Sequence, residues 1–253
     1  MYKSVNLTMR KYIQSISILL ILQFAICSDD LTPNQMLEKS VNRLDSIDFE
    51  MVINGKTTEG KKVEKANFKI SIHWDINEEK YKMIYIKELV EEGEKGRKMW
   101  VHFHRDKKNQ KWTMLPRSGK IKDITNKKSS QKIDLSSISF PIGILKNEMV
   151  FLDNETVNDV PCKVIEIKDE DGNIRFWVDP VDFIIHKKEY YNKKSKISKE
   201  VTYSDLTVYG DLKFYQNERI FNTRKESTVE ISLEEFEKVT FENLNKFNIP
   251  LKK

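Results

Sequence analysis

The sequence predicts a mainly β protein, built around a curved and mostly antiparallel sheet with few helices. Two observations support this prediction. From Phe49 onwards, apolar and polar residues alternate with a period of two through most of the chain, which is the pattern of half-buried strands. These segments recur about every dozen residues with turn-forming residues between them, which favours antiparallel hairpins over a parallel α/β sheet.

The N-terminus predicts an export signal. Arg10 and Lys11 precede an apolar run, Ile16 to Ile26, that is too short to span a bilayer, which takes about 20 residues. We therefore expect residues 1–27 to be a signal peptide. Residues 28–253 would then form one exported domain in the periplasm.

Two ways of processing this signal remain open, and they differ in the fate of Cys27. Cleavage after Cys27 would release a soluble chain. Alternatively, Phe24 to Cys27 form a degenerate lipobox, in which Cys27 would be lipidated and would tether the protein to a membrane. In either case Cys162 is the only cysteine of the folded domain, so no internal disulfide is expected.

The charge balance gives no reason to expect a nucleic-acid partner. The chain carries 44 Lys and Arg against 39 Asp and Glu, a net charge of +5. The signal contains Lys3, Arg10 and Lys11 and no acidic residue, so the net charge of the mature chain falls to about +2. We expect a monomer with charges of both signs interleaved on solvated strand faces.

One helix is predicted directly after the signal. Thr32 can cap it, Pro33 suits its first position, and Gln35 stands where the partner in a capping box belongs. Its apolar residues recur at helical spacing and form one face that needs a partner surface: Leu37, Val41 and Leu44.

Strands are predicted for most of the remaining chain. The clearest runs from Phe68 to Trp74, where Phe68, Ile70, Ile72 and Trp74 alternate with polar residues. Residues 120–140 are polar and are predicted to form a long loop, either functional or a simple insertion, with a short helix near 133–138. The other expected strands are 81–86, 98–103, 111–115, 163–167, 174–178, 184–191, 197–203, 211–214, 219–221 and 228–233.

The sequence shows no catalytic constellation. His102 and His104 would share one strand face, but neither they nor His73 and His186 follow an established metal-ligand spacing. No nucleophile elbow, phosphate-binding loop or dinucleotide fingerprint is present. We therefore expect no enzyme, no metal and no cofactor.

The strands carry many large apolar side chains for a sheet that has little helix to cover it. One consequence would be a face that stays partly unfilled and accepts an apolar ligand, since such pockets are mostly hydrophobic with few polar groups. The alternative is a closed core in a structural or partner-binding envelope lipoprotein. The sequence does not decide between the two.

Several short motifs resemble the LolA/LolB-like superfamily, in its outer-membrane lipoprotein-sorting branch. The most specific stretch is Lys111 to Ile121, which contains Trp112, Pro116 and Gly119 in a spacing similar to a signature of that branch. Residues 98–103, 176–179, 186–191 and 227–231 resemble its other strands in the same order. The family's lid-latching arginine would fall near Trp74, where this chain has none.

The resemblance implies a half-open antiparallel barrel with helices as a lid, and a cavity that shields acyl chains of lipoproteins or lipids. It also implies a membrane-bound donor or acceptor protein as a partner. The lid would be the helix bearing Leu37, Val41 and Leu44. We expect the cavity to be lined by Phe68, Ile70, Ile72, Trp74, Met83, Tyr85, Trp100, Trp112 and Met114, with Phe176 and Val178 as further candidates.

Overall fold

The computed structural model describes residues 31–44, 46–75, 78–104, 108–126, 147–168 and 172–250. The expected signal peptide with Cys27 lies outside these ranges. Most of the predicted loop at 120–140, including the short helix expected near 133–138, also lies outside them.

The described chain forms one α-helix, two short 3-10 helices and fourteen strands. The helices are α2 (Pro33–Val41), η1 (Asn42–Leu44) and η4 (Asn245–Phe247). The strands are β1 (Phe49–Glu59), β2 (Lys62–Trp74), β3 (Lys82–Leu89), β4 (Lys98–Phe103), β5 (Gln110–Met114), β6 (Ile121–Asp123), β7 (Met149–Phe151), β8 (Glu155–Val157), β9 (Val160–Ile167), β10 (Ile174–Val178), β11 (Ile185–Tyr191), β12 (Ile197–Tyr209), β13 (Leu212–Asn222) and β14 (Ser227–Lys238).

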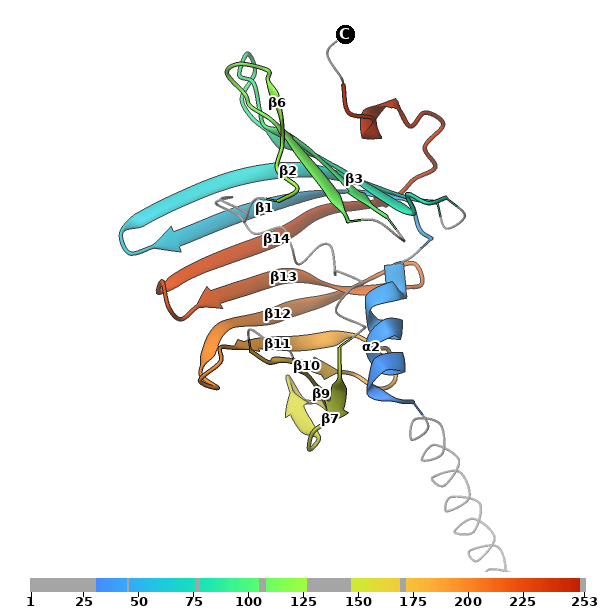
Figure 1. Cartoon of the computed structure of the whole chain (residues 1–253), viewed down its shortest axis with the longest axis vertical. Coiled ribbons are helices and arrows are strands. Elements are labelled where there is room, and N and C mark those ends of the chain that lie inside the picture. The colour runs from blue at the N-terminus through green and yellow to red at the C-terminus, as the bar shows by residue number, and fades with distance from the viewer. Residues whose placement is uncertain are drawn as a thin grey trace, which may run out of the picture.

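The strands form one antiparallel sheet in the order β6-β5-β4-β3-β2-β1-β14-β13-β12-β11-β10-β9-β7, with β8 paired to β9 (Figure 1). Sequence-adjacent strands pair as hairpins from β1 to β6 and from β8 to β14, as the turn spacing predicts, whereas β7 pairs with β9. The first and last long strands, β1 and β14, pair along their whole length and join the two halves. In the described residues the edge strands β6 and β7 do not pair with each other, so the predicted open, curved antiparallel sheet is confirmed.

The start of the predicted polar loop is a strand instead. Ile121–Asp123 forms β6, whose Asp123 pairs with Trp112 of β5. A strand at the edge of a sheet faces water along one side, so it tolerates the polar residues from which a loop was inferred.

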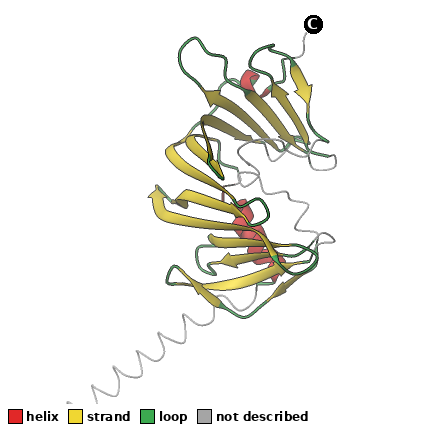
Figure 2. Cartoon of the chain, turned by 90° about the vertical axis from the view of Figure 1, so that its left-hand side faces the viewer, coloured by secondary structure: helices red, strands yellow, loops and turns green. Residues whose placement is uncertain are grey.

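Helix α2 begins with the predicted cap. The Gln35 backbone N–H donates to Thr32 Oγ1 at 3.3 Å, and the Thr32 N–H donates to Gln35 Oε1 at 2.9 Å. The helix lies within the bend of the sheet (Figure 2), with Met36 and Leu37 fully buried against β7, β9 and β10. We call the sheet face toward α2 the inner face and the opposite one the outer face. No helix in the described ranges is long and apolar enough to cross a membrane.

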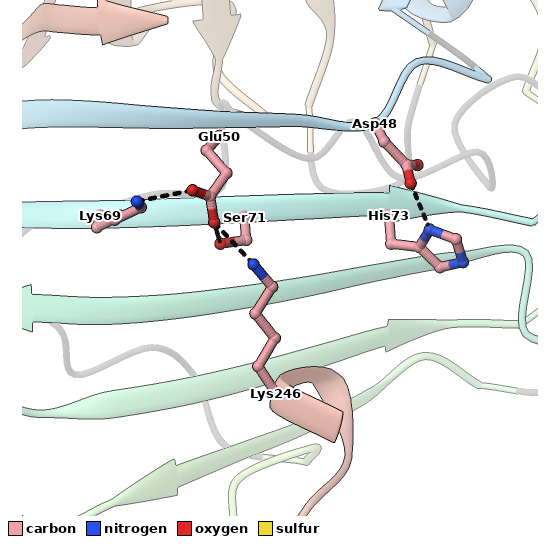
Figure 3. A network of polar contacts seen from close by, with 6 residues as sticks. All are labelled: Asp48, Glu50, Lys69, Ser71, His73 and Lys246. Carbon is pink, nitrogen blue, oxygen red and sulfur yellow. Dashed lines mark hydrogen bonds and ion pairs between the residues drawn. The ribbon is translucent and has the colours of Figure 1, made fainter. Parts of the chain in front are cut away.

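The chain after β14 crosses the outer face of β1 to β4. We call residues 239–250 the C-terminal strap. Lys246 Nζ donates to Glu50 Oε1 at 2.8 Å, and the same carboxylate is held by Lys69 at 2.7 Å and Ser71 at 2.6 Å (Figure 3). Phe247 of the strap is fully buried. The strap therefore adds a second, small core on the face opposite to α2.

Candidate functional site

An apolar cavity of about 300 Å³ lies on the inner face, between the C-terminal end of α2, η1 and the sheet. Residues of β1, β2 and β14 form much of its wall: Phe49, Met51, Ile53, Ile72, Ile231, Leu233 and Phe236. On β1 these are every second residue, because alternate side chains of a strand point to the same face. The alternation that predicts the strand therefore also supplies the wall.

The end of the predicted lid helix covers the cavity. Val41 at the last turn of α2 and Leu44 in η1 both line it. Leu37, one turn earlier, does not reach the cavity but packs with Phe176 and Val178 in a closed cluster whose exposure is essentially zero. The N-terminal half of the helix therefore packs in the core through its apolar face, and its C-terminal end covers the cavity.

Aromatic side chains bound the cavity where β2, β3 and β4 meet. Trp74, Tyr81 and Phe103 line it there, with the Trp74 and Tyr81 ring centroids 6.1 Å apart. Lys82 Nζ lies 4.2 Å from the Trp74 ring centroid, a cation–π contact. Trp74 Nε1 is buried and has no hydrogen-bond partner among the described residues. This end offers a polarisable surface with one unused N–H donor.

The opposite end, on β11 to β13, is polar. Lys188, Tyr203 and Glu218 line it, and Lys188 is only 4% exposed. Burial lowers the pKa of Lys188 to about 8, although the nearby Glu218 carboxylate acts to raise it. Burial also raises the pKa of Tyr203 well above its ordinary value. The cavity is therefore apolar along most of its wall and charged at one end.

A second groove, of about 680 Å³, is more polar. It is lined mainly by amide, hydroxyl and charged side chains of five strands, among them Asn54, Lys56, Asn217, Glu230 and Ser232. Several of these side chains interact with one another. Ser232 Oγ donates a hydrogen bond to Asn217 Oδ1 at 2.8 Å, and Lys56 forms an ion pair with Glu230 at 2.8 Å. The smaller apolar cavity is the better ligand-site candidate, because most of its wall is apolar and only a minority of its lining residues are polar.

Six of the predicted site residues lie on the inner side. Ile72 and Trp74 line the cavity, while Ile70 and Phe68 belong to the same core cluster further along β2. Phe176 and Val178 are buried beneath α2.

The remaining five predicted lining residues face the other way. Trp100 pairs with Tyr85 and with Trp112, and its Nε1 donates to the Lys246 carbonyl of the strap at 3.0 Å. By strand alternation Met83 and Met114 share this outer face. Met83 and Tyr85 do not line the cavity because of the pairing register. Ile72 pairs with Ile84, so the residues of β3 that face inward are Ile84 and Ile86. The residues placed outside are Met83, Tyr85, Trp100, Trp112 and Met114.

Sequence reasoning missed the polar end of the cavity. Lys188 was inside a correctly predicted strand, but a lysine in an alternating pattern is assigned to solvent by default. It also missed Phe49, Met51 and Ile53, although their alternation was a usable signal. The described residues contain no group of three or more His, Cys, Asp or Glu side chains placed to hold a metal ion.

Comparison with known protein families assigns this chain to one of them. A family model described as "Uncharacterized protein" matches residues 78–244, well over half of the chain. The chain belongs to this family. The match runs from just before β3 into the C-terminal strap, and so includes Lys82 beside the aromatic end of the cavity and Lys188 and Glu218 at its polar end. Among curated proteins no sequence match is found.

Solved structures share the fold. A DUF1329 family protein from Desulfovibrio piger superposes with a TM-score of 0.75 at 16% identity, covering 85% of this chain and 95% of that one. An outer membrane lipoprotein-sorting protein domain from Vibrio parahaemolyticus gives 0.71 at 16% identity, covering 84% and 94%. A LolA superfamily protein from Nitrosomonas europaea gives 0.62 at 12% identity, covering 87% and 98%. The predicted LolA-like fold is thereby confirmed.

Proposed function

We propose that this protein is a non-catalytic binding protein of the bacterial periplasm that shelters acyl chains of a lipid or lipoprotein. The observation that supports this most directly is the apolar cavity under α2, with Ile72 and Leu233 in its wall and Val41 in its roof. The outer membrane lipoprotein-sorting name of one fold relative agrees with such a role. The signal peptide expected at residues 1–27 would deliver residues 28–253 to that compartment as one domain.

The energetics suit a carrier. Transferring an acyl chain from water stabilises the complex by about 0.8 kcal/mol for each buried methylene, on the order of 10 kcal/mol for a palmitoyl chain. Met36 and Leu37 anchor α2 in the core, so the residues of the lid that a bound chain would contact are Val41 and Leu44 at its C-terminal end.

The test is co-purification followed by titration. The full chain is purified from its host, and bound lipid is extracted and identified by mass spectrometry. The delipidated protein is then titrated with a fluorescent fatty acid. Stoichiometric lipid that the probe displaces is the expected result.

Two matched variants locate the site. Trp74→Ala removes a cavity side chain and should weaken probe binding, whereas Trp112→Ala removes an outer-face side chain and should not. If neither the parent nor the variants bind lipid or probe, the proposal is wrong. The closed-core, partner-binding envelope lipoprotein would then be the better account.

A further inference from the structure

Three neighbouring hairpin turns form a basic edge on the sheet. They connect β1 to β2, β13 to β14 and β11 to β12, and Figure 1 shows them together at the strand ends that lie away from α2. The pairing register brings them side by side: Glu59 at the end of β1 pairs with Ser227 at the start of β14, which pairs with Asn222 at the end of β13. We call residues 59–62, 192–196 and 222–226 the basic edge.

The basic edge carries a large excess of positive charge. It contains seven basic residues and only two acidic ones, Glu59 and Glu226. Because the mature chain has a net charge of only about +2, the rest of that chain is net negative. The next turn on the same side, between β3 and β4, is acidic, so the positive charge does not continue to it. The seven basic residues of the edge are Lys61, Lys62, Lys193, Lys194, Lys196, Arg224 and Lys225.

The side chains of this edge are open to solvent. All seven basic residues are exposed, and Lys62, which forms an ion pair with Glu64 at 3.0 Å, still has 72% of its side chain exposed. Two apolar residues beside the turns are exposed as well. Val63 follows Lys62 and is 52% exposed, and Ile197 follows Lys196 and is 37% exposed. The edge therefore presents positive charge together with apolar side chains.

This combination fits a membrane surface better than the surface of a folded protein. Basic residues are attracted to anionic lipid headgroups, and apolar side chains next to them can enter the boundary between headgroups and acyl chains. From β2 to β11 the edge covers five strand spacings, roughly 24 Å. A bilayer presents negative charge over the whole of that length, so all three turns can contact it together.

We propose that the basic edge docks the protein on the surface of a membrane that contains anionic phospholipid. This inference does not depend on the acyl-binding function, because the edge and the cavity lie toward opposite ends of β1 and β14. Phe49 and Phe236 line the cavity near one end of these strands, whereas Glu59 and Ser227 lie at the other. Docking through the edge would leave α2 and the lid end of the cavity uncovered (Figure 1).

Vesicle co-sedimentation tests the inference. The delipidated full chain is mixed with vesicles of phosphatidylcholine alone or of phosphatidylcholine with phosphatidylglycerol, which share their acyl chains and differ in headgroup charge. A lipid anchor at Cys27, or uptake of lipid by the cavity, would act on both kinds of vesicle, so the difference between them reports the charge. Binding to the anionic vesicles should be at least about tenfold tighter at about 0.1 M salt, and this preference should be lost at about 0.5 M, because salt screens exposed charges.

A triple variant of the β11–β12 turn locates the contact: Lys193→Gln, Lys194→Gln and Lys196→Gln. Asn192 Oδ1 accepts hydrogen bonds from the backbone N–H groups of Lys194 and Lys196, at 2.8 and 3.2 Å. The side chains can therefore be replaced without removing these hydrogen bonds of the turn. The variant should bind anionic vesicles about tenfold more weakly than the parent and neutral vesicles equally well.

The matched control removes the same charge from three exposed lysines near β5 and β6: Lys108→Gln, Lys111→Gln and Lys122→Gln. It should keep the preference for anionic vesicles. Equal binding of the parent to both kinds of vesicle would overturn the inference and leave an acidic protein as the partner to seek for this edge. An equal loss in the two triple variants would also overturn it, because net charge alone would then explain the binding. Neither result bears on acyl binding, which the fluorescent probe measures separately.

Discussion

The carboxylate of Glu50 should make the C-terminal strap sensitive to acid. Burial opposes its ionisation, but hydrogen bonds from Lys246, Lys69 and Ser71 outweigh that effect and lower the pKa of Glu50 from 4.5 to about 2 (Figure 3). A pKa lower in the folded than in the unfolded chain stabilises the fold above pH 4.5. This contribution is lost as the pH falls from 4.5 toward 2.

The size of the effect follows from the pKa and the exposure. A tenfold change in a proton equilibrium corresponds to about 1.4 kcal/mol, which gives about 3 kcal/mol as an upper value for Glu50. Solvent reduces it, because the Lys69 and Lys246 side chains are 46% and 32% exposed. We expect Glu50→Gln to lower the free energy of unfolding by about 1–2 kcal/mol at pH 7.

The difference in the free energy of unfolding is measured by urea denaturation of the parent and of Glu50→Gln at several pH values between 7 and 3. The difference between the two proteins should shrink steadily below pH 4.5. Glu230→Gln is a suitable control, because its partner Lys56 is on the surface and both side chains are nearly half exposed. That variant should change stability by less than about 1 kcal/mol. A Glu50→Gln difference that stays constant with pH, or no difference at pH 7, would refute the reasoning.

Three further predictions concern packing and local backbone geometry. Phe247→Ala should lower the free energy of unfolding by about 3–5 kcal/mol in urea denaturation, because this ring of the strap is fully buried against the sheet; a loss below about 1 kcal/mol would show that the strap does not hold the sheet. Cys162 should resist alkylation at pH 7 until the protein unfolds, since burial raises the pKa of its thiol to about 11; rapid labelling of the native protein, followed by peptide mass spectrometry, would contradict this. Gly172→Ala should lower the melting temperature clearly and Gly119→Ala much less: both have positive φ, but a Cβ at Gly172 would stand 1.9 Å from the Tyr191 carbonyl oxygen, whereas the space around Gly119 is open. Equal shifts in the two variants would exclude that clash as the cause.

Local patterns in the sequence were sufficient for the elements themselves. Thr32, Pro33 and Gln35 predict the start of α2, and the structure has that capping box. The alternation from Phe68 to Trp74 predicts the C-terminal half of β2, and the turn spacing predicts antiparallel hairpins. These features depend on neighbours in the chain, so a window of a few residues contains what determines them.

The two faces of the sheet could not be assigned in the same way. Alternation shows that Trp100 and Val101 point to opposite faces, but both neighbours are apolar and either could have been inside. The strap decides this, because it gives the outer face of β4 an apolar cover of its own. A strand with a core on both faces has no polar side from which its orientation could be read.

The sequence by itself determined a mainly β chain with one capped helix, antiparallel hairpins and a resemblance to LolA-like proteins. Only the tertiary structure decided which residues meet at the cavity, that Lys188 lies inside it, and that Trp112 and its outer-face neighbours do not. The physical reason is the separation in sequence of the residues that interact. Periodicity and capping act between residues close in the chain. The cavity depends instead on the pairing of β1 with β14, and the orientation of the outer-face residues depends on the strap, which joins residues as far apart as Glu50 and Lys246, 196 positions apart in the sequence.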